Sequence, residues 1–84
     1  MFNEMLKKLA FEVVYLSKES EEFREHEQEM DCTRTYARMQ EARHIMVMLF
    51  GAEATTQAVI DARSKCKNLS AYQIWRDYVY QENM

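Results

Sequence analysis

Apolar residues near the N-terminus recur at helical spacing. At 100° per residue, one stripe falls within an arc of about 100° and consists of Phe2, Met5, Leu6, Leu9, Val13, Leu16 and Phe23. A second, shorter group, Phe11, Val14 and Tyr15, points to the opposite side. A helix with apolar residues on two sides packs against two partners. We therefore expect the stripe to face the chain's own core and Phe11, Val14 and Tyr15 to form an interface with a second subunit.

The segment that follows this helix is rich in glutamate and poor in apolar residues. Such a segment stays helical by propensity but has little to bury. We expect the first helix to run over 2–30 and the chain to break near 30–32, where Asp31 or Thr33 can cap the next helix. The alternative is one continuous helix over 2–50, about 73 Å long. The hairpin is favoured because polar residues in the charged segment already interrupt the apolar stripe.

Gly51 is the only glycine of the chain, which contains no proline. The second predicted helix, 33–50, ends in an uninterrupted apolar run from Ile45 to Phe50. A helix end that is apolar all round is typical of a buried position, so we place it at the centre of the core. Gly51 is expected to end this helix from the left-handed C′ position, with a positive φ.

Two shorter helices are predicted after Gly51, over 54–67 and 71–82. The second begins with the sharpest local motif in the chain, a capping box formed by Ser70 and Gln73. The side chains expected to point inward from it are Ile74, Trp75, Tyr78 and Val79. The predicted fold class is all-α: one domain over 1–84, in which a long antiparallel helical hairpin precedes two shorter helices in an orthogonal or bundle-like arrangement.

The composition adds an expectation of self-association. A chain of 84 residues buries only about 64% of its unfolded surface, so its stability margin is narrow. Yet 48% of the residues are apolar. A surplus of apolar side chains favours closure by a second copy, and we expect a homodimer.

Charge and cysteine usage narrow the range of partners and compartments. The net charge is −3, which argues against non-specific binding to nucleic acid. No apolar run approaches the length of a membrane span, and acidic residues interrupt the N-terminal segment, which does not resemble a signal peptide. Cys32 and Cys66 fit no metal-ligand spacing. A cytoplasmic protein without a membrane partner is expected.

Two groups of residues could bind metal. Glu41 and His44 have the Glu-x-x-His spacing of di-iron carboxylate bundles, but the chain holds one such pair, on the polar side of its helix. Glu19, Glu22 and Glu25 form Glu-x-x-Glu pairs, which bind Mg²⁺ in some all-α nucleotide pyrophosphohydrolases. Those enzymes continue with a Glu-x-x-Asp that this chain lacks. We interpret both groups as solvated helix surface and expect no cofactor.

The segment 54–82 could also form a helix-turn-helix, with its last helix as the recognition helix. The residues that would contact nucleic acid are Arg63, Lys65, Lys67, Tyr72, Gln73 and Arg76. The acidic net charge and the inward aromatic residues of that helix weigh against DNA binding.

The favoured function is a small non-enzymatic protein-interaction module, an adaptor or regulator that acts as a homodimer. The sequence contains no phosphate-binding glycine loop and no Cys-x-x-Cys, and its spacing indicates no nucleophile–base pair. The alternatives are a DNA-binding regulator built on 54–82 and a carboxylate/His metal-binding bundle.

Overall fold

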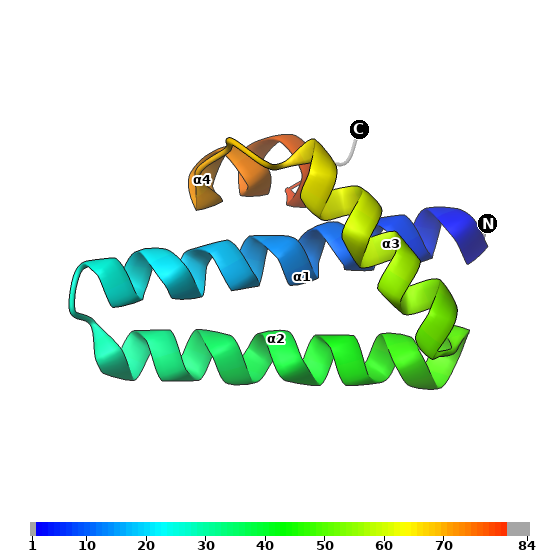
Figure 1. The fold of residues 1–84 in the computed structure, drawn as a ribbon, viewed down its shortest axis with the longest axis horizontal. Helices are drawn as coiled ribbons and strands as arrows, with labels where there is room; N and C mark the ends of the chain where they lie inside the picture. The colour runs from blue at the N-terminus through cyan, green and yellow to red at the C-terminus, as the bar shows by residue number, and fades with distance from the viewer. Residues whose placement is uncertain (1, 81–84) are drawn as a thin grey trace.

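The computed structural model describes residues 2–80, and within that range every regular element is a helix. The elements are α1 (Phe2–Glu25), α2 (Glu29–Phe50), α3 (Ala52–Lys65), α4 (Ala71–Ile74) and the π-helix η1 (Trp75–Val79). The long helices α1 and α2 run antiparallel and side by side, as Figure 1 shows. The predicted all-α class and the long helical hairpin are thus confirmed.

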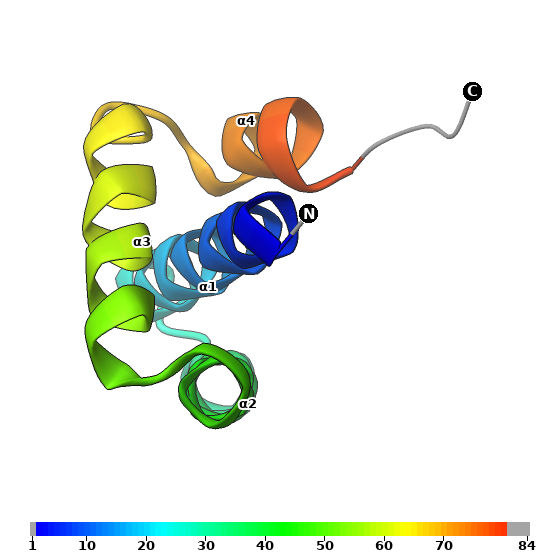
Figure 2. The same ribbon diagram turned by 90° about the vertical axis from the view of Figure 1, so that its right-hand side faces the viewer.

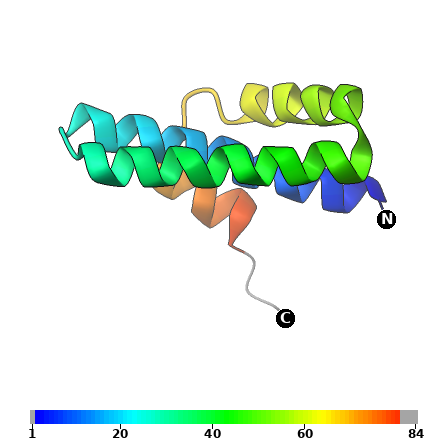
Figure 3. The same cartoon turned by 90° about the horizontal axis from the view of Figure 1, so that it is seen from below.

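The central element is α1, which packs against each of the other four described elements. Figure 2 shows α2 on one side of α1, α4 on the opposite side and α3 alongside both helices of the hairpin. In Figure 3, α3 runs back along the hairpin from the end of α2. This arrangement agrees with apolar residues on two sides of the first helix. The buried hydrophobic cluster consists of Ala10, Val13, Val14, Met46, Val59, Ala62, Cys66 and Ile74.

The turn between α1 and α2 is a Schellman motif. Glu27 adopts a positive φ of 61°, and its N–H donates to the carbonyl of Arg24 at 3.0 Å. The N–H of Gln28 donates to the carbonyl of Phe23 at 2.8 Å. This pair of bonds satisfies the last carbonyls of a helix and reverses the chain. Glutamate occupies the position where glycine is usual.

The predicted position of this turn was therefore wrong. The first helix ends at Glu25 and not at residue 30, and the second begins at Glu29 and not at residue 33. The N-cap of α2 is Gln28, whose side chain makes no capping hydrogen bond. Neither Asp31 nor Thr33 is therefore the cap. The Schellman bonds at the end of α1 determine where the hairpin turns.

A buried serine joins the two helices of the hairpin. Ser20 is 2% exposed, and its hydroxyl donates to the carbonyl of Cys32 at 3.3 Å. Its oxygen also lies 3.3 Å from the Cys32 sulfur. A buried hydroxyl with a partner carries little desolvation cost. Ser20 lies on the apolar stripe at helical spacing, and it forms a contact between α1 and α2.

The apolar end of α2 does not lie at the centre of the core, and that prediction was wrong. Met46 is fully buried, whereas Met48 is 73% exposed, Leu49 61% and Ile45 45%. The reason is the position of α2 at the edge of the molecule, where the other helices cover one of its faces (Figure 2). A run of apolar residues on such a helix leaves its outer side uncovered.

Gly51 alone links α2 to α3, with φ 90° and ψ 159°. The positive φ confirms the prediction, but the ψ value places the residue outside the left-handed helical region, in an extended region open essentially to glycine. Its N–H donates to the carbonyl of Val47 at 2.8 Å. The residue is exposed. Because the link is one residue long, α3 starts and ends two residues before the predicted 54–67.

The predicted capping box at the start of α4 is confirmed. The Gln73 N–H donates to Ser70 Oγ at 3.2 Å, and the Ser70 N–H donates to Gln73 Oε1 at 2.9 Å. Beyond Ile74, which is fully buried, the helix widens into η1. The Tyr80 N–H donates to the carbonyl of Trp75 at 2.6 Å, the five-residue spacing of a π-helix.

The side chains expected to face inward from this segment are buried to different degrees. Trp75, expected to be inside, is partly buried and stacks on Tyr80 with ring centroids 4.7 Å apart. Tyr78 and Val79 are also partly buried and pack against the hydrophobic cluster. Residues 81–82 of the predicted helix lie outside the described residues.

Among the buried side-chain nitrogen and oxygen atoms that the structure describes, the hydroxyl of Thr55 makes no hydrogen bond. Thr55 is 0% exposed, so the hydroxyl has lost its water without gaining a protein partner. Thr55→Val keeps the shape and removes the polar atom. We expect this substitution to raise the free energy of unfolding by about 1 kcal/mol, measured by urea denaturation followed by circular dichroism. A decrease would show that the hydroxyl has a partner in solution.

Candidate functional site

The predicted interface residues of α1 lie beside the chain's own C-terminal helices. Phe11 stacks on Tyr78 of η1 with ring centroids 4.3 Å apart and an interplanar angle of 10°. Val14 is 5% exposed and belongs to the hydrophobic core. Tyr15 is partly buried and packs against the same core. The chain's own aromatic residues thus occupy the face that was assigned to a second subunit.

Tyr15 also faces a carboxylate of its own helix. Its hydroxyl donates to Glu19 Oε2 at 2.7 Å. Burial, together with this hydrogen bond and the negative charge of Glu19, raises the pKa of Tyr15 to about 12. The hydroxyl therefore remains protonated at neutral pH and stays a donor.

Three large, uncovered apolar residues of α2 lie together near its C-terminal end. We call Ile45, Met48 and Leu49 the α2 patch; at helical spacing they span an arc of about 100°. All three are exposed. Figures 1 and 2 show α2 at the edge of the molecule, with the other elements on one side of it. Large exposed apolar side chains that adjoin one another are typical of interaction sites.

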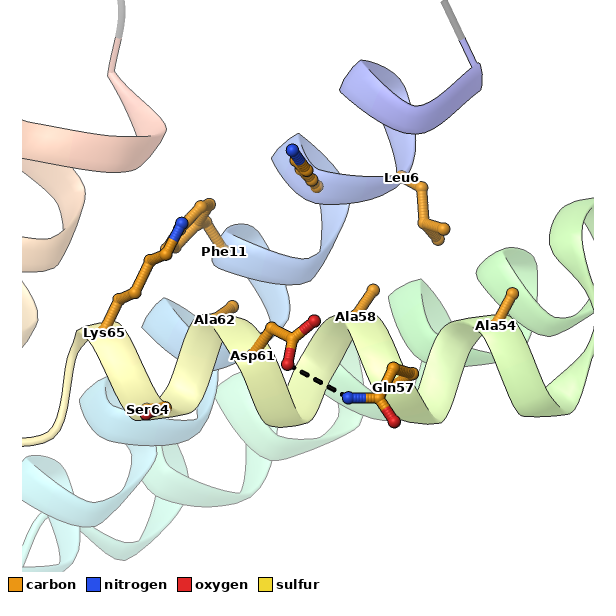
Figure 4. A pocket seen from close by; sticks show the side chains of 10 residues that line it. Leu6, Phe11, Ala54, Gln57, Ala58, Asp61, Ala62, Ser64 and Lys65 are labelled. Carbon is orange, nitrogen blue, oxygen red and sulfur yellow. Dashed lines mark hydrogen bonds between the residues drawn. The ribbon is translucent and has the colours of Figure 1, made fainter.

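A groove of about 560 Å³ lies between α1 and α3. The residues lining it are Leu6, Lys7, Phe11, Ala54, Gln57, Ala58, Asp61, Ala62, Ser64 and Lys65. Figure 4 shows the small side chains of Ala54, Ala58 and Ala62 along α3, below Leu6 and Phe11 of α1. Gln57 donates to Asp61 at 3.0 Å. The groove is apolar at its base and charged at its rim, and it is open to solvent.

The candidate nucleic-acid residues do not form one surface. Arg63, Lys65 and Lys67 are exposed. Positions two residues apart on a helix do not face the same way, so Arg63 and Lys65 diverge, and Lys65 lines the groove beside Phe11 (Figure 4).

The candidates on the predicted recognition helix have partners within the chain. Arg76 Nε lies 2.9 Å from Asp77 Oδ1, and its guanidinium sits 5.8 Å from the ring centroid of Tyr72. The Arg76 guanidinium lowers the pKa of the Asp77 carboxyl. Gln73 is held in the capping box. Tyr72, at 63% exposed, retains a free surface.

The candidate metal ligands are not gathered into a site in the described part of the chain. Glu41 and His44 are both exposed on α2. No group of three or more His, Cys, Asp or Glu within residues 2–80 could hold a metal ion. Cys32 and Cys66 are free thiols, and burial raises the pKa of Cys66, which keeps it protonated.

Glu22 has a structural role that the sequence analysis missed. Its Oε2 accepts the N–H of Ala71 at 2.8 Å, across 49 positions of the chain. The first N–H groups of a helix have no partner within the helix, and a carboxylate at that end is favourable. The capping box at residue 70 signalled that such donors exist, but nothing local identified the acceptor.

Comparison with protein-family models, curated proteins and solved structures found no match for this chain. The fold is an all-α hairpin with two shorter helical segments packed on it. Within residues 2–80, none of the helices combines the length and apolar character needed to cross a membrane.

Proposed function

We propose that this protein is a small non-enzymatic interaction module that acts as a homodimer through the α2 patch. The observation that supports the proposal is the exposure of three adjoining large apolar side chains, Ile45, Met48 and Leu49. Burying a large apolar side chain contributes about 1.5–3 kcal/mol. An interface centred on these residues would therefore be stabilised by the removal of their side chains from water.

A second copy suits this patch because the surface around it is self-complementary. Exposed Arg38 and Glu41 lie on the same side of α2 as Ile45. In a two-fold interface each patch meets its own copy, so the Arg of one copy can approach the Glu of the other. Segment 31–54 carries three basic and three acidic residues, which avoids net repulsion. Met48 adds an adaptable side chain.

Within residues 2–80, no group of three or more His, Cys, Asp or Glu could hold a metal ion, and the candidate acidic residues Glu19 and Glu22 hold Tyr15 and the start of α4. We therefore assign the output of this protein to binding. Its two unpaired cysteines fit a reducing compartment, and we place the function in the cytoplasm.

The test is the mass in solution of the wild type and two matched variants. Light scattering after size-exclusion chromatography at micromolar concentration should give twice the monomer mass of 10.1 kDa. Met48→Glu places a charge at the centre of the patch and should return the mass to that of the monomer. Ile60→Glu is the control, because Ile60 is also exposed, at 52%, but lies on α3 outside the patch.

Two results would contradict the proposal. A wild-type mass of 10.1 kDa at micromolar concentration would eliminate the homodimer. A dimer that Ile60→Glu disrupts and Met48→Glu leaves intact would exclude the α2 patch as the interface.

The alternative functions have separate tests. DNA binding by 54–82 rests on four exposed basic residues, Arg63, Lys65, Lys67 and Arg76. A salt-dependent shift with duplex DNA that disappears when these charges are removed would favour it. Metal binding at Glu41 and His44 predicts bound iron, manganese or zinc after metal-supplemented expression.

A further inference from the structure

A second concave site lies between α1 and the segment formed by α4 and η1. It has a volume of about 280 Å³. We call it the aromatic pocket. Its lining residues are Tyr15, Glu19, Glu22, Phe23, His26, Gln28, Ala71, Tyr72 and Trp75. The volume lies just below the range of drug-sized ligand sites, about 300–1,000 Å³, and suits a small head group or one side chain.

Aromatic rings form much of the lining of this pocket. Two come from α1, Tyr15 and Phe23, and two from the C-terminal segment, Tyr72 and Trp75. The Tyr72 and Trp75 ring centroids are 6.1 Å apart. Stacking on Tyr80 at 4.7 Å supports the indole. The faces of aromatic rings attract cations, and several rings around one cavity are the usual receptor for a quaternary ammonium group.

The charge of the pocket also favours a cation. Glu19 and Glu22 both line it. The raised pKa of Tyr15, caused by burial and by Glu19, is in keeping with a negative environment. The basic side chains around the pocket include His26, which lines it. Arg38 lowers the pKa of Tyr15, in opposition to Glu19. Arg76, which lies over the Tyr72 ring, is paired with Asp77 at 2.9 Å.

The hydrogen bonds of the two carboxylates indicate which cation fits. Glu19 accepts the Tyr15 hydroxyl, and Glu22 accepts the Ala71 N–H. Bidentate arginine recognition uses both oxygens of one carboxylate, so at either glutamate it would compete with one of these internal hydrogen bonds. A quaternary ammonium has no N–H to donate, so it requires only ring faces and negative charge. We propose that the aromatic pocket binds a trimethylammonium group.

This inference does not depend on the proposed dimer, because the aromatic pocket shares no residue with the α2 patch. Two sources of the group exist: a free small cation such as choline, and a trimethylated lysine on a peptide. Both present the same chemistry to the rings. The experiment therefore uses each of them in turn.

Trp75 lines the pocket and is the only tryptophan of the chain, so its fluorescence reports directly on occupancy. Choline chloride is titrated at constant ionic strength and should give a saturable change. The neutral carbon isostere, in which a tert-butyl group replaces trimethylammonium, should bind about tenfold more weakly. A short peptide carrying trimethyl-lysine is compared with its unmodified form. Binding of the modified peptide more tightly than choline would identify a protein side chain as the source.

Two variants test the residues. Glu19→Gln removes one charge but keeps an oxygen that can accept the Tyr15 hydroxyl, and it should weaken choline binding about threefold to tenfold. Tyr72→Ala removes an exposed ring and should also weaken it. Glu21→Gln, the same change at an exposed neighbour outside the pocket, is the control and should have no effect.

Three outcomes would overturn the inference. They are the absence of a saturable signal from both choline and the trimethyl-lysine peptide, equal affinity for choline and its neutral isostere, and equal loss of affinity in Glu19→Gln and Glu21→Gln. Circular dichroism of each variant establishes that it is folded before titration.

Discussion

Met46→Ala should lower the free energy of unfolding by about 2–5 kcal/mol, whereas Met48→Ala should change that of the monomer by less than about 0.5 kcal/mol. The two methionines stand two positions apart on α2, but Met46 is 0% exposed and Met48 is 73% exposed. Truncating Met46 removes apolar contacts and leaves a cavity in the core beside α1 and α3. Truncating Met48 removes atoms that are already in water. Urea denaturation followed by circular dichroism measures both values.

Protein concentration is the control for this comparison, because Met48 belongs to the proposed dimer interface. The stability of a dimer rises with concentration, whereas the cost of a cavity does not. The Met48→Ala effect should therefore appear only where the wild type is dimeric, and the Met46→Ala effect should be the same throughout. Similar losses for the two variants in dilute solution would contradict the exposed position of Met48.

The sequence predicted the helical hairpin because periodicity and polar interruption are local signals. The turn was predicted too late in the chain because Asp31 and Thr33 are typical capping residues, whereas the helix ends earlier, at residues that carry no usual stop signal. Glu27 takes a positive φ of 61° and completes a Schellman turn. A non-glycine residue there costs about 1–2 kcal/mol, which the bonds of the turn and the packing of α1 on α2 offset. Because this stabilisation comes from contacts along the whole hairpin, the residues around the turn show no local pattern that predicts it.

The apolar run from Ile45 to Phe50 shows a second limit. Periodicity identifies which face of a helix is apolar, but a run that is apolar on every side does not indicate which of its residues face the core. Whether it is central or peripheral depends on how many neighbours surround the helix, which is a property of the tertiary structure. Here α2 lies at the edge, so Met46 enters the core while the outer residues of the run form the α2 patch.

The site residues depended on contacts between distant segments. Phe11 faces Tyr78, and Glu22 accepts from Ala71, 49 positions away. The sequence correctly marked the second apolar side of α1 and the capping box at Ser70. It contained no signal that these two features belong together, so the face of α1 was assigned to a second subunit. The aromatic pocket arises from the same long-range pairing, and for the same reason it could not be predicted from the sequence.

Gly51→Val should lower the free energy of unfolding by about 2–3 kcal/mol, close to the upper end of the cost for a strained backbone position. A Cβ at this position would meet nothing within 4 Å, so the penalty comes from the backbone and not from a clash. The residue sits at φ 90° and ψ 159°, where asparagine, which tolerates left-handed helical positions, gains no advantage. Gly51→Ala and Gly51→Asn should therefore also destabilise the protein, by about 1–2 kcal/mol. Urea denaturation of the three variants measures the series, and an asparagine variant as stable as the wild type would show that the turn adopts the ordinary left-handed conformation in solution. Because α3 starts directly after Gly51, strain here acts on the only connection between α2 and the two segments that cover α1.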